Sequence, residues 1–371
     1  MNQKNRPVRI LISGGGTGGH IFPALSIANA LRRRLPDCEI LFVGAIGRME
    51  MERVPAAGYR IEGLPVAGFD RKRLWRNFGV LVKLWKSMRK ARRIVKDFAP
   101  DAAVGVGGYA SGPVLKEAQR RGIPTLIQEQ NSYAGVTNKL LAPRAMAICT
   151  AYEGMERFFP ADRITLTGNP VRKELTQCVL TQAEAKKNLG FDPEKPLVFV
   201  TGGSLGARTV NDATAAMLRK LQAAGIQLLW QTGRLYETEC AAKAADYPQV
   251  KASAFISDMA TAYRAADLVV ARAGAGTISE LQLLGKAALL IPSPNVAEDH
   301  QRRNAEALVD HGAAAMLLDA EAVERLGEEA TRLVADKEKL SKLSGAAAAM
   351  AMTDSDEKIT DTLLSLINTG K

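Results

Sequence analysis

The chain contains 371 residues, of which 47% are hydrophobic and 24% are charged, a composition typical of a globular protein. This length predicts two domains. No apolar stretch is long enough to cross a bilayer or to form a signal-peptide core, so we expect a cytoplasmic chain without a transmembrane segment. The four cysteines form no C-x-x-C pair, which argues against a zinc site or a disulfide framework.

The formal net charge of +11 is unevenly distributed along the chain. Residues 1–171 hold 27 Lys and Arg against 13 Asp and Glu, a balance of +14, whereas residues 172–371 hold 23 against 26, a balance of −3. This concentration of positive charge in the first half predicts a polyanionic partner, which could be nucleic acid or an anionic membrane surface.

Residues 10–30 pass from a short apolar run through a cluster of glycines into a periodic apolar stretch, which predicts a strand, a tight turn and a helix. The glycines satisfy the G-x-G-x-x-G spacing of a dinucleotide-binding loop. Such a loop also needs an acidic residue about 20 positions further along the chain. The next predicted strand, 39–43, is followed by no carboxylate before Glu50. We therefore interpret the glycine loop as an anion-binding loop at a helix N-terminus, not as a nicotinamide site.

His20 lies where this loop becomes a helix and is one of three histidines in the chain. Two interpretations stay open. The imidazole could simply bond to the backbone at the start of the helix. Alternatively, it could act as a general base, because the ordinary pKa of an imidazole lies near neutral pH.

Residues 71–96 form a basic segment with eleven Lys and Arg and no Asp or Glu. Two apolar stripes run along it at helical spacing, one formed by Trp75, Phe78, Val82 and Trp85 and the other by Leu81, Leu84, Met88, Ala91 and Val95. Tryptophan beside basic residues is typical of a helix at a membrane interface. The alternative is a helix whose apolar face is wholly buried in the core. No nucleic-acid-binding motif is visible, so we do not expect nucleic acid as a partner.

Strands alternate with helical patterns in both halves, which predicts parallel α/β sheets. The strands are predicted near 8–13, 39–43, 102–106, 124–128, 146–149, 226–231, 268–271 and 287–291, and a further apolar run opens the segment "PLVFVTGGSLGARTVNDATAAML" of the second half. Strand, glycine turn and helix occur twice, at 10–30 and at 197–218. We therefore expect two doubly wound domains that face a cleft, with ligands beyond the carboxyl ends of the strands.

Three further segments have the composition of ligand loops. "GVGGYASGP" puts Gly107 and Gly108 at a strand end, where the glycines could serve the turn or let a diphosphate approach the backbone. "GGSLGAR" and "RAGAGTISEL" each lead from a strand into a helix start suited to phosphate. Glu280, in the first turns of the second of these helices, could accept hydrogen bonds from ribose hydroxyls or could merely favour the helix dipole.

Seven segments together resemble one known family: "GGGTGGHIFPALSIA", "GVGGYASGP", "QEQNSYAGVTNKLLA", "TGNPVR", "GGSLGAR", "RAGAGTISEL" and "EDHQRRNA". In this order and over nearly the whole chain, they are similar to the bacterial MurG family. The resemblance implies a GT-B fold with two Rossmann-like domains. The first domain, 1–171 with a C-terminal helix at about 352–371, would bind the acceptor and the membrane, and the second, 172–351, would bind UDP-N-acetylglucosamine.

The resemblance also implies roles for individual residues. The implied mechanism needs a base, and we predict that His20 is the catalytic base, because no carboxylate lies in the first glycine loop. Gly15, Gly16, Gly107 and Gly108 would receive the acceptor diphosphate. The donor would be bound by Thr17, Gly18, Gly19, Asn131, Arg172, Ser204, Ile256, Ala275, Gly276, Thr277, Glu280, His300 and Gln301.

The activity implied is that of a hexosyltransferase of peptidoglycan synthesis. It would move N-acetylglucosamine, with inversion, to the muramoyl C4 hydroxyl of undecaprenyl-diphospho-muramoyl-pentapeptide (lipid I), giving lipid II. We expect no cofactor and no metal, a peripheral position at the cytoplasmic face of the plasma membrane, and proteins of cell-wall synthesis as further partners. The alternatives are another UDP-sugar glycosyltransferase, a UDP-N-acetylglucosamine 2-epimerase, which needs no acceptor, and a basic adaptor without enzymatic activity.

Overall fold

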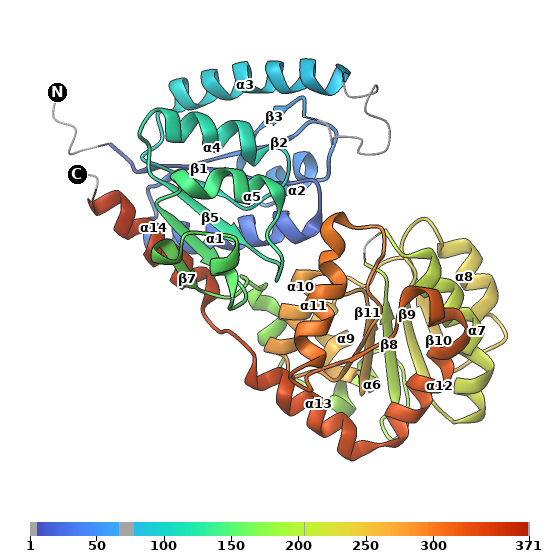
Figure 1. Cartoon of the computed structure of the whole chain (residues 1–371). Coiled ribbons are helices and arrows are strands. Elements are labelled where there is room, and N and C mark those ends of the chain that lie inside the picture. Colours follow the sequence, from blue (N-terminus) through green and yellow to red (C-terminus); the bar gives the residue numbers. More distant parts are fainter. Residues whose placement is uncertain (1–5, 67–77, 204, 370–371) are drawn as a thin grey trace. The chain divides into compact units, whose positions relative to one another are not determined.

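The computed structural model describes residues 6–66, 78–203 and 205–369 (Figure 1). The chain divides into two compact units. The first comprises Met1–Val171 together with Thr353–Lys371, and the second comprises Arg172–Met352. Each unit is described by itself.

The described part of the first unit contains a seven-stranded parallel sheet in the order β3-β2-β1-β4-β5-β6-β7. Its central strands are almost wholly buried, as parallel strands covered on both faces must be. The strands are β1 (Arg9–Ser13), β2 (Glu39–Ala45), β3 (Arg60–Leu64), β4 (Ala102–Gly105), β5 (Thr125–Glu129), β6 (Ala147–Thr150) and β7 (Ile164–Leu166).

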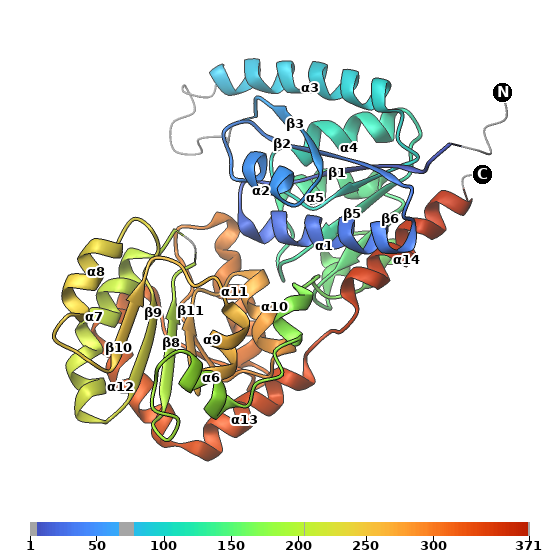
Figure 2. The ribbon, with the colours of Figure 1, turned by 180° about the vertical axis from the view of Figure 1, so that it is seen from behind.

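Helices cover both faces of this sheet (Figures 1 and 2). One face packs against α1 (Gly18–Arg34) and α14 (Ser355–Thr369), whose Ile359, Leu363 and Ile367 join the apolar core beside β1 and β4. The other face packs against α3 (Phe78–Phe98), α4 (Ser111–Arg120) and α5 (Val136–Leu141). The short helix α2 (Glu50–Ala56) connects β2 to β3.

The second unit repeats the architecture with a six-stranded parallel sheet in the order β10-β9-β8-β11-β12-β13 within its described residues. Its strands are β8 (Leu197–Thr201), β9 (Gln227–Gln231), β10 (Val250–Ser253), β11 (Leu268–Ala271), β12 (Ala288–Leu290) and β13 (Ala315–Met316). The apolar core on one face is built with α7 (Arg208–Ala223), α8 (Glu237–Ala244), α12 (Ala322–Ala335) and α13 (Lys337–Ala349). The remaining helices are α6 (Gln182–Asn188), α9 (Met259–Ala265), α10 (Ala275–Leu283) and α11 (His300–Val309).

The strand order determines where a ligand site can form. In each unit the order reverses beside the first strand, between β1 and β4 in the first unit and between β8 and β11 in the second. The carboxyl ends of the strands at such a switch point are where open α/β sheets bind ligands. All four predicted glycine-rich turns, after β1, β4, β8 and β11, lie at these two positions.

The predicted doubly wound parallel fold is confirmed, and each of the predicted strands is present within one or two residues. Four strands were not predicted from apolar runs: β3, β7, β10 and β13. All four are edge strands of their sheets.

Candidate active site

The first unit presents two glycine turns beside its switch point, one after β1 and one after β4. Gly107 and Gly108 adopt positive φ values of 90° and 83°, which favour glycine. A Cβ atom on Gly108 would lie 2.4 Å from the carbonyl oxygen of Gly15. The two turns therefore pack backbone against backbone, and glycine is needed at 108 both for its conformation and for this close approach.

His20, the third residue of α1, lies between these two turns. Its Nδ1 atom lies 3.1 Å from the carbonyl oxygen of Gly15 and 3.2 Å from the Thr17 hydroxyl. A Cβ atom on Gly107 would lie 2.9 Å from the Nε2 atom of the ring. The imidazole thus bonds to the backbone, as the structural interpretation expects, and also lies at the switch point, as the catalytic interpretation requires. The role of base stays a prediction.

Glu50, for which the sequence predicted no role at the site, holds the first glycine turn in place. Glu50 begins α2, is 1% exposed, and accepts hydrogen bonds from the N–H groups of Gly16 and Ala45. A carboxylate engaged in this way has no ribose-binding role, which agrees with the rejection of a nicotinamide site. A Cβ atom on Gly44 would lie 2.5 Å from the Glu50 side chain, so glycine at this position makes room for the carboxylate.

The predicted donor residues of the first unit lie at the ends of β1 and β5. Thr17 precedes α1 as its N-cap residue, and Gly18 and Gly19 form the first turn of that helix. Asn131 follows β5, and its backbone N–H and side-chain amide both donate to the buried carboxylate of Glu129, at 3.1 and 3.2 Å. The structure thus holds these residues at the carboxyl edge of the sheet, while their contacts with a donor stay predictions.

The second unit brings together three polar side chains from three segments of the chain. Arg172 Nη2 donates to Oε1 of Glu280 at 2.8 Å, and the hydroxyl of Tyr263 in α9 donates to Oε2 at 2.9 Å. Glu280 lies in α10, with 14% of its side chain exposed. Burial, and then the negative charge of Glu280, raises the pKa of Tyr263 well above its usual value, so this hydroxyl remains a donor. Arg172 and Glu280 were both predicted, and Tyr263 was not.

The N-terminus of α10 is built from small residues. Gly274 is its N-cap residue, and Ala275, Gly276 and Thr277 form the first turn, with no acidic side chain there. A Cβ atom on Gly276 would meet nothing within 4 Å, so the backbone is open at this position. Backbone N–H groups at such a helix start, together with the positive end of the helix dipole, suit a phosphate group.

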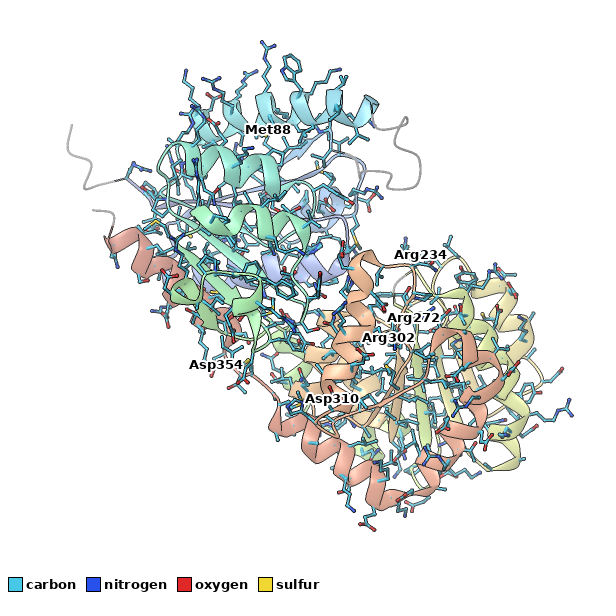
Figure 3. The ribbon with its side chains drawn as sticks, in the orientation of Figure 1. Met88, Arg234, Arg272, Arg302, Asp310 and Asp354 are labelled. Carbon is cyan, nitrogen blue, oxygen red and sulfur yellow. The ribbon has the colours of Figure 1, made fainter. Side chains whose placement is uncertain are left out.

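The strand end before α10 is anchored by Arg272 (Figure 3). Its guanidinium donates to the carbonyl oxygens of Ile291 and Pro292, each at 3.2 Å, and pairs with Asp319. These bonds tie the segment after β11 to the segment after β12. Arg272 is therefore engaged in holding the loops, rather than presented to a ligand.

A hydrogen-bond network links the turns after β8 and β10. The Ile256 N–H donates to Oε1 of Gln231 at 3.0 Å, and Nε2 of Gln231 donates to the Thr201 hydroxyl at 2.9 Å. The same hydroxyl accepts from the N–H of Gly203 at 3.1 Å. A backbone contact between Ile256 and a base would therefore use its carbonyl oxygen. The neighbouring Ser204, predicted to bind the donor, lies outside the described residues.

His300 and Gln301 begin α11, after a turn with unusual backbone conformation. Glu298 and Asp299 have φ values of 57° and 51°, a left-handed conformation that non-glycine residues rarely adopt. The Gln301 Oε1 atom accepts from the N–H of Ser293 at 2.9 Å, which ties the start of the helix to the end of the preceding strand. Left-handed non-glycine residues persist where surrounding contacts hold them, often at binding sites. The predicted sugar contacts of His300 and Gln301 stay predictions.

The basic segment forms α3, which is buried along only part of its length. Ala91, Ile94 and Val95 join the core, and Met88 lies on the side of the helix that faces α4 (Figure 3). In contrast, four apolar side chains near the start of the helix are 42 to 61% exposed: Leu81, Val82, Leu84 and Trp85. The alternative of a wholly buried apolar face is therefore wrong. Trp75 and the side chain of Phe78 lie outside the described residues.

Among the described residues, no helix is long and apolar enough to span a membrane. In the same part of the chain, no group of three or more His, Cys, Asp or Glu side chains lies close enough together to hold a metal ion.

The chain matches the models of two protein-family domains. The glycosyltransferase family 28 N-terminal domain matches residues 10–150, and the glycosyltransferase family 28 C-terminal domain matches residues 197–359. These two segments contain the glycine turns of the first and second units, respectively.

Curated relatives match over nearly the full chain. A protein of Phocaeicola vulgatus is 60% identical over 351 residues, which cover 94% of this chain and 93% of that protein. A protein of Bacteroides thetaiotaomicron is 56% identical over 365 residues, covering 97% and 98%. Both are named UDP-N-acetylglucosamine–N-acetylmuramyl-(pentapeptide) pyrophosphoryl-undecaprenol N-acetylglucosamine transferase. Among solved structures, MurG of Acinetobacter baumannii is similar with a TM-score of 0.77 and 29% identity, covering 97% of this chain and 100% of that one.

Proposed function

The chain belongs to glycosyltransferase family 28 and has the GT-B fold, and we propose which of its residues bind the donor, the acceptor and the membrane and which residue takes the proton. It is a hexosyltransferase that moves N-acetylglucosamine from UDP-N-acetylglucosamine to N-acetylmuramyl-(pentapeptide) pyrophosphoryl-undecaprenol. This step turns lipid I into lipid II.

The donor is proposed to bind to the second unit. The observation that carries this proposal is the position of the Glu280 carboxylate. Glu280 lies three residues after Thr277, near the start of α10, and its carboxylate accepts hydrogen bonds from Arg172 and Tyr263. Two oxygens of a fixed carboxylate suit the vicinal hydroxyls of a ribose, because each oxygen can accept more than one hydrogen bond. The α10 N-terminus, Ser204 and the Arg172 guanidinium would meet the diphosphate, and the Ile256 carbonyl would accept from uracil.

The acceptor is proposed to bind to the first unit, with its diphosphate at the two glycine turns. Gly107 and Gly108 bring the backbone close to a ligand without side chains in the way. His20 would then take the proton of the muramoyl C4 hydroxyl while the oxygen of that hydroxyl forms a bond to the anomeric carbon of N-acetylglucosamine. The bond from that carbon to the UDP oxygen breaks with inversion, and UDP leaves with the electron pair. No metal is given a role, because N–H groups and Arg172 can meet the leaving charge.

The first unit is further proposed to lie on the cytoplasmic face of the plasma membrane through α3. Trp85 and its exposed apolar neighbours belong to the segment 71–96, which contains eleven Lys and Arg and no acidic residue. Aromatic and aliphatic side chains would enter the headgroup region while Lys and Arg side chains contact anionic lipid. An acceptor with an undecaprenyl chain could then be used without leaving the bilayer.

Transfer of labelled N-acetylglucosamine to a short-chain lipid I analogue, with a chelator present, tests the proposal. A β-linked disaccharide product is expected, and its formation at full rate with chelator supports the metal-free assignment. UDP-N-acetylglucosamine that binds but is not transferred, with conversion of the sugar at C2, would instead indicate an epimerase. A matched reaction without acceptor separates the two outcomes, because only the epimerase acts on the donor alone.

A further inference from the structure

The carboxylate of Glu50 lies directly behind the first glycine turn. Glu50 is 1% exposed. Its Oε1 atom accepts from the N–H of Ala45 at 2.9 Å, and the N–H of Gly16 lies 3.1 Å from Oε1 and 3.0 Å from Oε2. Burying an ionised carboxylate is costly unless hydrogen bonds compensate it, and here the N–H groups of Ala45 and Gly16 supply them.

The backbone around Glu50 is shaped to admit its side chain. A Cβ atom on Gly15 would lie 2.1 Å from Glu50 Oε1, and one on Gly44 would lie 2.5 Å from Glu50 Cγ. Both distances are far below van der Waals contact, so glycine at each position makes room for the carboxylate. The turn after β1 and the end of β2 are therefore both built around Glu50.

One peptide group connects this carboxylate to His20. The N–H of Gly16 donates to Glu50, and the carbonyl oxygen of Gly15, which belongs to the same peptide group, lies 3.1 Å from His20 Nδ1. In a planar trans peptide the N–H and C=O bonds point in opposite directions. Glu50 and His20 thus lie on opposite sides of the Gly15–Gly16 peptide, each hydrogen-bonded to it.

We propose that Glu50 is a positioning residue that acts through the Gly15–Gly16 peptide to orient His20 and to keep its proton on Nδ1. The negative charge of Glu50 fixes the direction of the peptide N–H, and therefore the direction of the carbonyl. A carbonyl that faces Nδ1 accepts only from a protonated Nδ1, so Nε2 carries the lone pair. Hydrogen bonds in series also strengthen one another. The catalytic consequence rests on the proposed role of His20 as base.

Other groups also contact the ring. The Thr17 hydroxyl lies 3.2 Å from Nδ1, where it could accept the same proton or, in the other tautomer, donate to the Nδ1 lone pair, and the backbone of Gly107 adjoins Nε2. Neither group titrates near neutral pH. The Thr17→Val variant removes the competing hydroxyl while leaving Gly15 in place. It therefore separates the contribution of the peptide carbonyl from that of the hydroxyl.

The test compares Glu50→Gln with Glu52→Gln in the full chain. Glutamine keeps the size of the side chain at position 50 but removes its charge and one acceptor oxygen. Glu52 lies on the same helix, is exposed, and loses the same charge in the control variant. Nitrogen-15 NMR of the imidazoles, above the pH at which they are protonated, reports which ring nitrogen carries the proton. The His20 signal is assigned by its loss in His20→Gln, since the chain has only three histidines.

We expect His20 to be protonated on Nδ1 in the wild type, in Thr17→Val and in Glu52→Gln. In Glu50→Gln it should become a mixture of tautomers, with kcat reduced about 10- to 100-fold and the KM for UDP-N-acetylglucosamine unchanged. An unchanged tautomer in Glu50→Gln would overturn the proposal, even if turnover fell.

Two further outcomes are kept separate. If Glu50→Gln does not fold, Glu50→Asp serves instead, because it retains the charge but moves it away from the Gly16 N–H, and the same change of tautomer is expected. If His20→Ala turns over normally, the proposed base is wrong. The tautomer measurement then still decides whether Glu50 controls the ring, because it does not depend on catalysis.

Discussion

The hydroxyl of Tyr263 donates a 2.9 Å hydrogen bond to Oε2 of Glu280. The other carboxylate oxygen accepts from Arg172 at 2.8 Å, so the group is held from two sides by elements far apart in the sequence. A carboxylate fixed in this way loses little conformational entropy when a ligand binds. It still has lone pairs for ligand hydroxyl groups, because two carboxylate oxygens offer about four acceptor positions.

Replacement of Glu280 by alanine should weaken donor binding. Loss of the hydrogen bonds that two ribose hydroxyls would donate to the charged carboxylate is expected to raise the KM for UDP-N-acetylglucosamine by roughly 10- to 100-fold, with the acceptor KM unchanged. Steady-state kinetics with each substrate varied in turn measures this. Tyr263→Phe, which removes only the supporting hydroxyl, should raise the donor KM less, and Glu324→Ala, at an exposed position of α12, serves as the control. An unchanged donor KM in Glu280→Ala would rule out the ribose contact.

His20→Ala should lower kcat while leaving donor affinity intact. Loss of a general base typically costs about 10²- to 10⁴-fold in rate. The wild-type kcat should rise with pH as the imidazole loses its proton, and this limb should be absent from the variant. His311→Ala is the matched control, because His311 is exposed and belongs to the other unit. Near-normal turnover of His20→Ala at neutral pH would exclude His20 as the base.

The apolar start of α3 should control binding to lipid. Replacement of Leu84 and Trp85 by serine is expected to weaken cosedimentation with anionic liposomes by at least about tenfold, because both side chains would otherwise be buried in the headgroup region. Leu235→Ser is the control, since Leu235 is 74% exposed but lies in the second unit. Binding of the wild type should also fall as salt is added. Equal sedimentation of the Leu84/Trp85 variant and the wild type would count against the membrane assignment of α3.

Glu117 in α4 should make the stability of the first unit depend on pH. A hydrogen bond from Arg120, helped by Arg121, lowers the pKa of Glu117 from 4.5 to about 2. Because the folded pKa lies below the unfolded one, the stabilisation is complete above about pH 4.5 and is lost as the pH falls through 2. Glu117→Gln should therefore lower the free energy of unfolding by about 1 to 2 kcal/mol at pH 7, since the arginines are partly exposed and their charges are screened.

Urea unfolding at pH 7 and pH 3 measures this effect, and the difference between Glu117→Gln and the wild type should shrink at pH 3. Glu338→Gln is the control, because the side chains of Glu338 and its partner Lys342 are 77% and 70% exposed and their ion pair should contribute little. A difference that is the same at both pH values would show that the loss comes from packing rather than from charge.

The sequence was informative where a short local pattern carries the structure. Central strands such as β1 and β8 are continuous apolar runs, because both faces of a parallel sheet are covered. The edge strands β3 and β10 were missed for the same reason, since their residues are largely half-buried or exposed and form no such run.

Some polar residues of the site could likewise be predicted from the sequence, and others could not. The glycine turns and Glu280 could be found, because each lies in a short segment with a recognisable composition. Glu50 and Tyr263 could not be found. Each acts through a contact with a segment 17 to 34 residues away, which only the folded chain brings together.

The return of α14 to the first unit has a consequence for the synthesis of the protein. Ile359, Leu363 and Ile367 complete the core beside β1 and β4, yet the ribosome makes them only after the whole second unit. At about 5 to 20 residues per second, the roughly 180 intervening residues take about 10 to 40 s. During that time the nascent first unit exposes an apolar groove on one face of its sheet. The second unit can therefore complete its own core before the first, although the first unit is translated earlier.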